Sequence, residues 1–571
     1  MTPLPSILLG RDDQGHLSMN RASVGLLLVV LTVGTLVLRL AGIDFGLPYF
    51  KEPDTFVAEH VRSIRSGAPH ELDRQLSSCQ YPSLLADVCA PLSDAKGEPV
   101  GTEVTLAQHL RAASRPWLDV RIVVALLSIL AIPATFLVAR RFATPAWALF
   151  AAALCAFSLL HMFFAQQARP HAALVSITAL AIACALWLRR APSWKSYAAS
   201  ALVAGIAIGM LHNGMFVLAS FAAAQWLRED RRRFDPRIVL VAGAALIAFR
   251  AFYWFYFDDA AQRALSEDDA AHVVWSDLPI DGSGFVRIAR TLWFYEPVLL
   301  AFVSLAAVHW LASVRRVGAD ALVVLAHVVP YLLAFGLFSH TYERFALQLL
   351  PGLAVFAAWG ACRVQARLGR SAHVFGATCL ALLALCACAS TKLAWLRVRP
   401  STLDETAAWL LDPRNVDLAT EHVYAMPPLD LPVLRTREAL RGVRFTPWSI
   451  YQWKLAEEAK AAPLVQLRWF APKPEFGALE SGAQLDGYLA SFGRSLAITE
   501  AMPLHPERER LRDGLRRRGQ LLARISPDGD PRFSEHLLWA QDAEFGDWPN
   551  VFWRVLRARA VGPVIEIYRL E

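Results

Sequence analysis

Residues 23–43 read SVGLLLVVLTVGTLVLRLAGI, an apolar stretch in which Arg39 is the one charged residue. A helix needs about 20 such residues to cross the roughly 30 Å hydrocarbon core of a bilayer. The stretch is too long for the apolar part of a removable signal peptide, and it lacks a small-residue cleavage site. It therefore predicts a helix that stays in the membrane as an anchor.

Similar apolar stretches recur through most of the chain. Of its 571 residues, 55% are hydrophobic and 19% are charged, and the mean hydropathy is +0.35. This composition excludes a disordered chain and is unusual for a soluble globule. We therefore predict a polytopic α-helical membrane protein with about eleven transmembrane helices. Besides residues 23–43, the predicted spans are 120–139, 145–164, 171–188, 196–211, 213–227, 238–257, 291–314, 319–338, 345–362 and 373–394.

The segment 196–227 allows two interpretations. Polar side chains and a glycine in Leu211-His212-Asn213-Gly214 interrupt its apolar pattern. Two short spans fit this break, and so does one long kinked helix.

Basic residues gather in alternate short loops. The clusters are Arg140/Arg141, Arg189/Arg190/Lys195, Arg228 with Arg231 to Arg233 and Arg237, Arg315/Arg316, and Arg363/Arg367/Arg370. The positive-inside rule assigns such loops to the cytoplasmic face of a plasma (inner) membrane. With eleven spans, the N-terminus is then cytoplasmic. The long first loop 44–119, the loop 258–290 and the chain after residue 396 lie on the outer, periplasmic or extracytoplasmic side.

The tail has a different composition. From Arg397 to Glu571 there are 24 basic and 24 acidic residues, so the whole net charge of +7 lies in the apolar part, where it indicates membrane orientation rather than nucleic-acid binding. Ser401 to Glu405 form a capping-box pattern, and Pro563 to Arg569 form a strand pattern. We predict a membrane domain over 1–396 and a soluble α/β or α+β domain over 397–571 on the outer face.

Acidic residues follow the first span directly. Glu52 and Asp54 come before a stretch, Phe56 to Arg65, with apolar residues at helical spacing, which predicts a helix lying on the membrane surface. A carboxylate held there can act as a general base toward a hydroxyl. The alternative is that Asp54 only caps the helix.

Basic side chains near the outer face are candidates for binding an anionic headgroup. Arg344 is the best placed, because it begins a span and a guanidinium grips phosphate oxygens in a bidentate way. Pairing with lipid phosphates or with Glu343 is the alternative role. Arg250 lies deeper, where it snorkels outward or pairs with a ligand or carboxylate. Weaker candidates of the same type are Arg169, Arg287 and Arg290.

Three further residues are possible lining residues of a site. His171 lies in a very short outer loop, His212 lies at the break described above, and Tyr81 lies in the first loop; each histidine alone is more often a packed side chain than a ligand. Cys79 and Cys89 are the two cysteines of the outer segments and predict a disulfide in an oxidising space. The chain has no phosphate-binding G-x-x-x-x-G-K-[ST], no G-x-S-x-G and no H-E-x-x-H, so ATP-driven transport, serine-hydrolase and zinc-protease activities lack motif support.

Five short motifs, taken together, resemble a known group of enzymes. They are Gly46-Leu47-Pro48-Tyr49 with Pro53-Asp54, Tyr81-Pro82-Ser83-Leu84, Ala168-Arg169-Pro170-His171-Ala172, the stretch 205–214 and the stretch 342–351. In order and topology, roughly residues 23–400 resemble the C-type (GT-C) glycosyltransferases that use polyprenyl-phosphate sugars. This group includes the protein O-mannosyltransferases and the aminoarabinose transferases of lipid A.

The resemblance implies a function and roles for particular residues. It implies transfer of a sugar from a polyprenyl-phosphate donor to a lipid, glycan or protein acceptor at the outer face, without a nucleotide. Asp54 carries over as the catalytic base or acceptor-orienting group, and Arg344 as a contact of the donor phosphate. Thr55 and His171 stand where the group usually has acids, so dependence on a divalent metal stays open. A secondary transporter or lipid flippase and a noncatalytic assembly subunit are the alternative functions.

Overall fold

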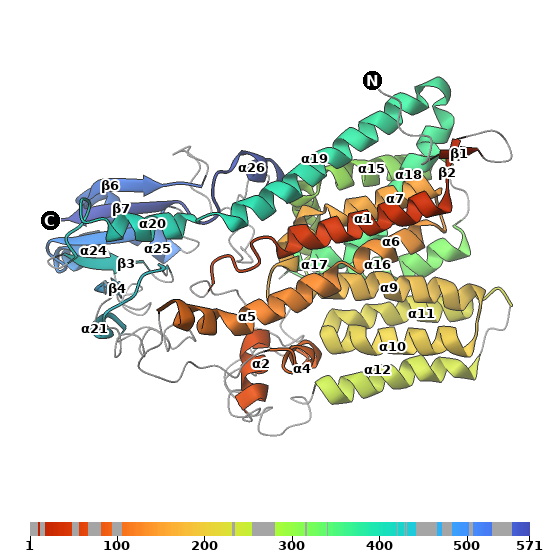
Figure 1. The fold of residues 1–571 in the computed structure, drawn as a ribbon, viewed down its shortest axis with the longest axis horizontal. Helices are drawn as coiled ribbons and strands as arrows, with labels where there is room; N and C mark the ends of the chain where they lie inside the picture. Colours follow the sequence, from red (N-terminus) through yellow and green to blue (C-terminus); the bar gives the residue numbers. More distant parts are fainter. Residues whose placement is uncertain are drawn as a thin grey trace. The chain divides into compact units, whose positions relative to one another are not determined.

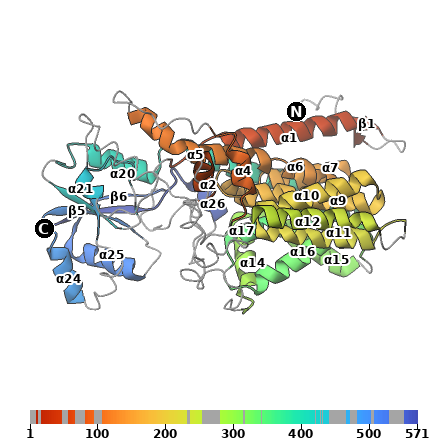
Figure 2. The same cartoon turned by 90° about the horizontal axis from the view of Figure 1, so that it is seen from below.

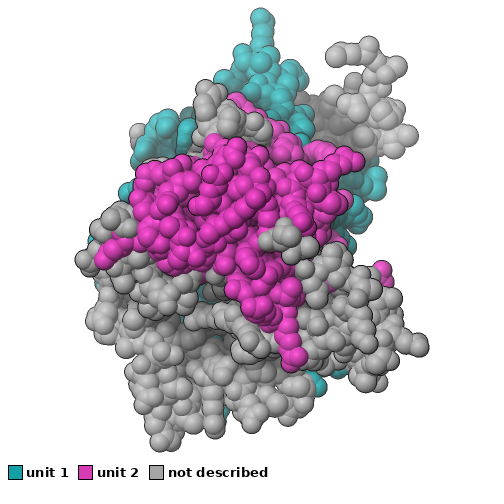
Figure 3. Space-filling model, turned by 90° about the vertical axis from the view of Figure 1, so that its left-hand side faces the viewer, with its two compact units in different colours: residues 1–43, 54–93, 118–392 teal, residues 44–53, 94–117, 393–571 magenta. Residues whose placement is uncertain are grey.

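The computed structural model describes most of the chain, in two compact units (Figure 3). Unit 1 comprises residues 1–43, 54–93 and 118–392, and unit 2 comprises residues 44–53, 94–117 and 393–571. The described residues are 9–11, 17–47, 56–66, 81–93, 106–230, 235–253, 280–313, 317–339, 341–418, 421–426, 429, 431–440, 465–470, 482–501, 506–527 and 551–571.

Unit 1 is helical (Figure 1). A short antiparallel pair, β1 (Leu9–Arg11) and β2 (Leu17–Met19), precedes the helices. The helices are α1 (Arg21–Leu40), α2 (Phe56–Ser66), α4 (Leu84–Cys89), α5 (Leu106–Ser128, whose first turns belong to unit 2), α6 (Ala131–Ala139), α7 (Pro145–Ala156), α8 (Leu159–Ala165), α9 (His171–Arg190), α10 (Trp194–Met210), η3 (His212–Phe216), α11 (Val217–Trp226), η4 (Pro236–Ile238), α12 (Val239–Phe252), α14 (Ser283–Tyr295), α15 (Pro297–Ser313), α16 (Ala319–Leu337), α17 (Glu343–Ala346), η7 (Leu347–Leu349), α18 (Leu350–Arg367), η8 (Gly369–Ser371) and α19 (Ala372–Val398, which runs into unit 2).

The number of apolar helices in the described residues that are long enough to span a membrane is lower than the number predicted from the sequence. Within the described ranges, 6 helices are long and apolar enough to cross a membrane, or up to 8 if the bent pairs α7/α8 and α14/α15 each count as one span. The prediction of about eleven is therefore not confirmed. The difference lies in α10, α11 and α12, which have 17, 10 and 14 residues and fall short of the length that a bilayer core requires.

The break at residues 211–216 separates two antiparallel helices. Tyr197, near the start of α10, donates a hydrogen bond from its hydroxyl to Gln225 Oε1, near the end of α11, at 2.6 Å. A long kinked helix would hold these two residues far apart, so the two-helix interpretation is the correct one. Gly214 makes the turn: a Cβ at this position would lie 1.9 Å from the carbonyl oxygen of Ala207.

We expect Gly214→Ala to lower the stability of the protein by about 1–3 kcal/mol, because η3 must move away from α10 to admit the methyl group. Thermal unfolding of the detergent-solubilised protein measures the effect. Gly243→Ala in α12 is the matched control, since a Cβ there meets nothing within 4 Å. An unchanged unfolding temperature in Gly214→Ala would contradict this account of the turn.

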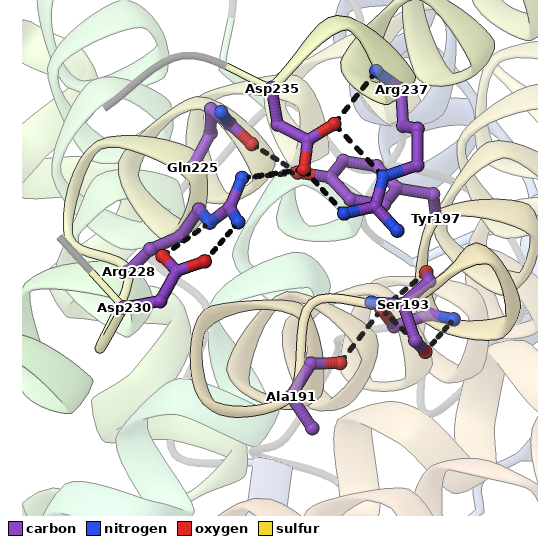
Figure 4. Close-up of polar contacts among 9 residues, drawn as sticks. Ala191, Ser193, Tyr197, Gln225, Arg228, Asp230, Asp235 and Arg237 are labelled. Atoms are coloured by element: carbon purple, nitrogen blue, oxygen red, sulfur yellow. Dashed lines mark hydrogen bonds and ion pairs between the residues drawn. The ribbon is translucent and has the colours of Figure 1, made fainter. Parts of the chain in front are cut away.

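Arginine-rich loops meet at one end of the unit 1 helices (Figure 4). Asp235, just before α12, accepts hydrogen bonds from Arg228 NH1 at 2.8 Å and from Arg237 NH2 at 2.6 Å. Arg189, at the end of α9, donates from Nε to Asp320 Oδ1 of α16 at 2.6 Å. Three of the predicted cytoplasmic loops thus share one end of the helices. Their side of the membrane stays a prediction.

The carboxylate of Asp235 links Arg228 and Arg237 at this end of the helices, and its contribution to stability depends on pH. Hydrogen bonds from Arg237 and Arg228 keep the pKa of Asp235 well below its ordinary value of 3.8. A carboxylate whose pKa is lower in the folded state than in the unfolded state stabilises the fold fully at pH values above its unfolded-state pKa. This stabilisation is lost as the pH falls through the folded-state pKa.

We expect Asp235→Asn to destabilise the protein by about 1–3 kcal/mol at pH 7. The gap between mutant and wild type should shrink as the pH falls below 3.8, the ordinary value of this carboxyl. Unfolding temperatures measured from pH 7 to pH 3 check both statements. A gap that stays constant over this range would refute the electrostatic role.

Unit 2 contains a mixed five-stranded sheet flanked by helices (Figure 2). Its strand order is β4 (Leu467–Trp469), β3 (His422–Ala425), β5 (Ser495–Glu500), β7 (Ile565–Leu570), β6 (Gln520–Ile525). The first three strands are parallel, and β7 is antiparallel to both β5 and β6. The helices are α20 (Thr402–Leu411), α21 (Arg437–Leu440), α24 (Gly482–Ala490), α25 (Pro506–Arg518) and α26 (Val551–Arg557).

Both local predictions for the tail are confirmed. The side chain of Ser401 accepts from Asp404 N at 3.3 Å, and Asp404 Oδ2 accepts from Ser401 N at 2.8 Å, which is the reciprocal capping box at the start of α20. Ile565 and Ile567 of β7 lie in the core beneath α20. The division of the chain at residue 396 stays a prediction.

Candidate functional site

A short segment between α8 and α9 forms the centre of the candidate site. The residue that follows this segment, His171, begins α9 and is 1% exposed. The ring of Tyr81 lies edge-on to the His171 ring, with 6.1 Å between the centroids. Ser83 N donates to the carbonyl oxygen of Phe252 at 3.1 Å, which attaches the Tyr81 segment to the end of α12. Two segments far apart in the sequence therefore meet here.

Two arginines lie beside this histidine. Arg169 and Arg344 are both close enough to His171 to interact with it electrostatically. Arg169 is fully buried. Arg344, on α17, is half-buried, and its guanidinium carbon lies 4.4 Å from the centroid of the Tyr342 ring. Stacking on an aromatic face restricts the orientation of a guanidinium.

One buried carboxylate accompanies the two arginines. Glu343 interacts electrostatically with Arg344 and Arg169, and Tyr295 donates to Glu343 Oε1 at 3.5 Å. The described residues thus bring two guanidinium groups and one carboxylate together at a buried position.

A sharp corner between α14 and α15 positions Tyr295. The two helices are bent by 119° at Glu296, whose Oε1 accepts from Ser158 Oγ at 2.7 Å and from Leu160 N at 2.8 Å. The predicted span 291–314 therefore does not exist as one helix. Residues 291–295 belong to α14, which approaches α16 closely at Gly284, where a Cβ would lie 2.0 Å from the carbonyl oxygen of Phe335.

The break in 211–216 adds polar groups to the same region. Asn213 Nδ2 donates to the hydroxyl of the fully buried Tyr331 at 3.1 Å. Tyr331 in turn interacts electrostatically with Arg344. The polar residues that interrupt the apolar pattern after α10 thus reach the arginine side of the site.

A second buried network fixes the segment that leads to His171. Gln166 Nε2 donates to the carbonyl oxygens of Arg39 at 3.0 Å and Ala41 at 2.6 Å. The guanidinium of Arg39 bonds Ser128 Oγ at 2.5 Å and lies 3.0 Å from His161 Nδ1. The end of α1 is thereby attached to α5 and α8.

Two buried polar side chains in or next to the segment have unused hydrogen-bonding capacity. Within the described part of the chain, His171 Nδ1 and both amide atoms of Gln167 are buried and have no hydrogen-bond partner. Buried polar groups normally have partners, so those that lack one are candidates to bind a ligand. Together with Arg169 and Arg344, they form a site suited to an anion.

The site lies at one end of the unit 1 helices, opposite the arginine-rich loops. His171 and Arg190 are the two ends of α9, which has 20 residues. At 1.5 Å per residue the ends are about 30 Å apart, which is the thickness of a bilayer core. If the loops at Arg189, Arg228 and Asp320 are cytoplasmic, the site lies at the outer face.

The other predicted site residues have local contacts in the structure or lie outside the described residues. His212 packs edge-on against the ring of Tyr253, with 4.7 Å between centroids. Arg250, in the last turn of α12, has an exposed side chain, unlike the buried groups around His171. Glu52 and Asp54 lie outside the described residues. The helix that follows them, α2, buries Val57 and Val61 and packs on α4.

The predicted disulfide is not supported. Cys89, on α4, is a buried free thiol, and Cys79 lies outside the described residues. In the described part of the chain, no group of three or more histidine, cysteine, aspartate or glutamate side chains could hold a metal ion.

Sequence reasoning missed several members of the site. From the sequence, Glu343 was predicted only as an alternative partner of Arg344. Tyr295, Tyr331 and Asn213 were not predicted to be site residues. Asn213 could have been predicted as a site residue, since it is a polar residue in an apolar stretch. Tyr295 and Tyr331 could not have been predicted in this way, because single tyrosines are common in apolar helices.

Comparisons with known proteins agree with the resemblance found in the sequence. Residues 85–219 match the profile of the dolichyl-phosphate-mannose-protein mannosyltransferase family. A comparison with curated proteins finds no match.

Among solved structures, ArnT from Cupriavidus metallidurans in the apo state matches with 13% identity and a TM-score of 0.42, covering 84% of this chain and 93% of that one. The same protein bound to undecaprenyl phosphate matches with 12% identity and a TM-score of 0.42, covering 94% and 97%. The oligosaccharyltransferase of Archaeoglobus fulgidus matches with 12% identity and a TM-score of 0.43, covering 86% and 71%. Scores this low do not establish a shared fold by themselves. The stretch 85–219, which holds Arg169, His171 and Asn213, is similar to the dolichyl-phosphate-mannose-protein mannosyltransferases, and the resemblance to the C-type glycosyltransferases is thereby confirmed.

Proposed function

We propose that the protein is an integral glycosyltransferase of the plasma (inner) membrane. It moves a sugar from a polyprenyl monophosphate to a hydroxyl of an acceptor lipid, glycan or protein at the outer face. The observation that carries the proposal is the pair of arginines, Arg169 and Arg344, beside the buried His171. A monophosphate is the ligand that two guanidinium groups at the end of a membrane helix suit best.

The family match supports the donor class. By its name, the family that matches residues 85–219 takes mannose from a dolichyl phosphate. Arg169 and His171 fall within that match, and Arg344 comes from a helix far along the chain. For this protein we propose only that the donor is a lipid phosphate, and we assign no particular sugar.

The chemistry follows from these roles. Asp54 takes the proton of the acceptor hydroxyl as its oxygen attacks the anomeric carbon. The bond from that carbon to the phosphate oxygen breaks, and the lipid phosphate leaves as an anion that Arg344 and Arg169 stabilise. A single displacement of this kind inverts the anomeric centre.

Lipid-linked sugar profiling in a deletion strain tests the proposal. The donor should accumulate when the gene is removed, and the purified protein should release polyprenyl phosphate from that donor only when an acceptor is present. Movement of the intact lipid across vesicles without cleavage would instead indicate a flippase, and the enzyme proposal would then be wrong.

A further inference from the structure

Unit 2 holds a cavity of about 700 Å³ between α25 and the strands β6 and β7. Its polar lining consists of Glu509, Arg512, Arg516, Arg524, Glu566 and Tyr568. Arg512 and Arg516 are one turn apart on α25, and Arg524 comes from β6. Three arginines from two elements therefore face one space.

A buried carboxylate organises the arginines. Glu566, on β7, is 2% exposed and accepts two hydrogen bonds from Arg516, from Nε at 3.1 Å and from NH2 at 2.9 Å. The Tyr568 hydroxyl donates to the same carboxylate at 2.8 Å. Burial, with the contribution of Glu566, raises the pKa of Tyr568 to about 12, so the phenol keeps its proton at neutral pH. The charge of Glu566 is thus satisfied inside the protein.

Two of the three arginines remain accessible, whereas Glu566 does not. The side chains of Arg516 and Arg524 are 39% and 26% exposed, against 3% for that of Glu566. Arg524 Nε lies 3.6 Å from Glu566 Oε1. Arg512 donates to the carbonyl oxygen of Ala501 at 2.9 Å and pairs with Asp513, whose Oδ1 accepts from Arg512 Nε at 3.0 Å. The guanidinium groups of Arg516 and Arg524 are therefore held in place by Glu566 and have further N–H groups that can donate to a ligand.

We propose that this cavity binds an oxyanion carried by a carbohydrate, that is, a sugar phosphate or an acidic sugar. Fixed guanidinium groups are suited to phosphate and carboxylate oxygens, and the cavity falls in the size range of small-molecule sites rather than that of a bare ion. Glu509 supplies an acceptor for sugar hydroxyls at the rim. The binding requires no sugar transfer, so it is independent of the proposed function.

Calorimetric titration of the full-length protein in detergent tests the proposal. The titrated protein carries Arg344→Ala, which weakens binding at the arginine site of unit 1, and the Arg524→Gln comparison below assigns the remaining binding to unit 2. Glucose 1-phosphate or glucuronate should bind saturably and more weakly as salt is added, and neutral glucose should bind far less. The tighter of the two acids identifies phosphate or carboxylate as the recognised group.

Arg524→Gln should weaken this binding about tenfold, since it removes a charge-assisted contact but leaves Arg516 and Tyr568 on Glu566. Arg510→Gln is the matched control, because Arg510 is exposed on the same helix and does not line the cavity. Absence of saturable binding, equal binding of glucose, or equal affinities in the Arg524→Gln and Arg510→Gln proteins would overturn the proposal. None of these results would bear on transfer at the unit 1 site.

Discussion

Asp54→Asn should reduce the rate of sugar transfer by about 100- to 10,000-fold, the usual contribution of a general base. This corresponds to roughly 3–5 kcal/mol of barrier. The substitution keeps the size of the side chain but removes the basic oxygen. Transfer is measured as polyprenyl phosphate released in the presence of acceptor, and donor binding is measured separately. Insertion into the membrane and donor binding should be retained.

The same substitution separates the base from a helix cap. Asparagine and aspartate cap helices about equally well, so a protein in which Asp54 only caps α2 would stay active. Glu52→Gln is the matched comparison two residues away. Near-normal transfer by Asp54→Asn would remove the catalytic assignment, and loss of transfer in Glu52→Gln alone would move it to Glu52.

Arg344→Ala should weaken donor binding by roughly 10- to 100-fold, which is the range of one charge-assisted hydrogen-bonding group. Arg344→Lys should give an intermediate affinity, because lysine keeps the charge but lacks the planar fork. The measurement is equilibrium binding of a polyprenyl-phosphate sugar to the detergent-solubilised protein. Arg169, fully buried beside His171, keeps part of the affinity in both variants.

A control from the other end of the same helical stretch guards against a general effect of charge. Arg363, near the end of α18, is exposed. Arg363→Ala removes one positive charge but should leave donor binding unchanged. Equal affinities in the wild-type, Arg344→Ala and Arg344→Lys proteins would contradict the role of Arg344.

Local sequence patterns predicted what depends on neighbouring residues. The anchor helix at 21–40, the capping box at Ser401 and the strand at 565–570 follow from apolar length, side-chain spacing and alternation. The clustering of arginines in alternate loops likewise predicted that those loops share one end of the helices. The described residues support fewer spans than predicted, because α10, α11 and α12 are shorter than the length that a bilayer core requires.

For the candidate site, too, the sequence identified residues but not the contacts between them. The sequence singled out Arg344, Arg169, His171 and Tyr81, since charged and aromatic groups at the ends of apolar stretches rarely lack a role. It could not show that these residues meet, because they come from segments up to 263 positions apart, from Tyr81 to Arg344. Nor could it show the corner at Glu296, which is made by hydrogen bonds to a helix 136 residues earlier.

Only the tertiary structure decided which charges are balanced. Among the described residues of unit 1, Arg169 and Arg344 both interact with the buried Glu343 and lie beside His171. In unit 2, Glu566 is enclosed while Arg516 and Arg524 face a cavity. The sequence determines the residues that carry charge, but burial determines which of those charges remain available to a ligand, and burial depends on contacts between segments that are distant along the chain.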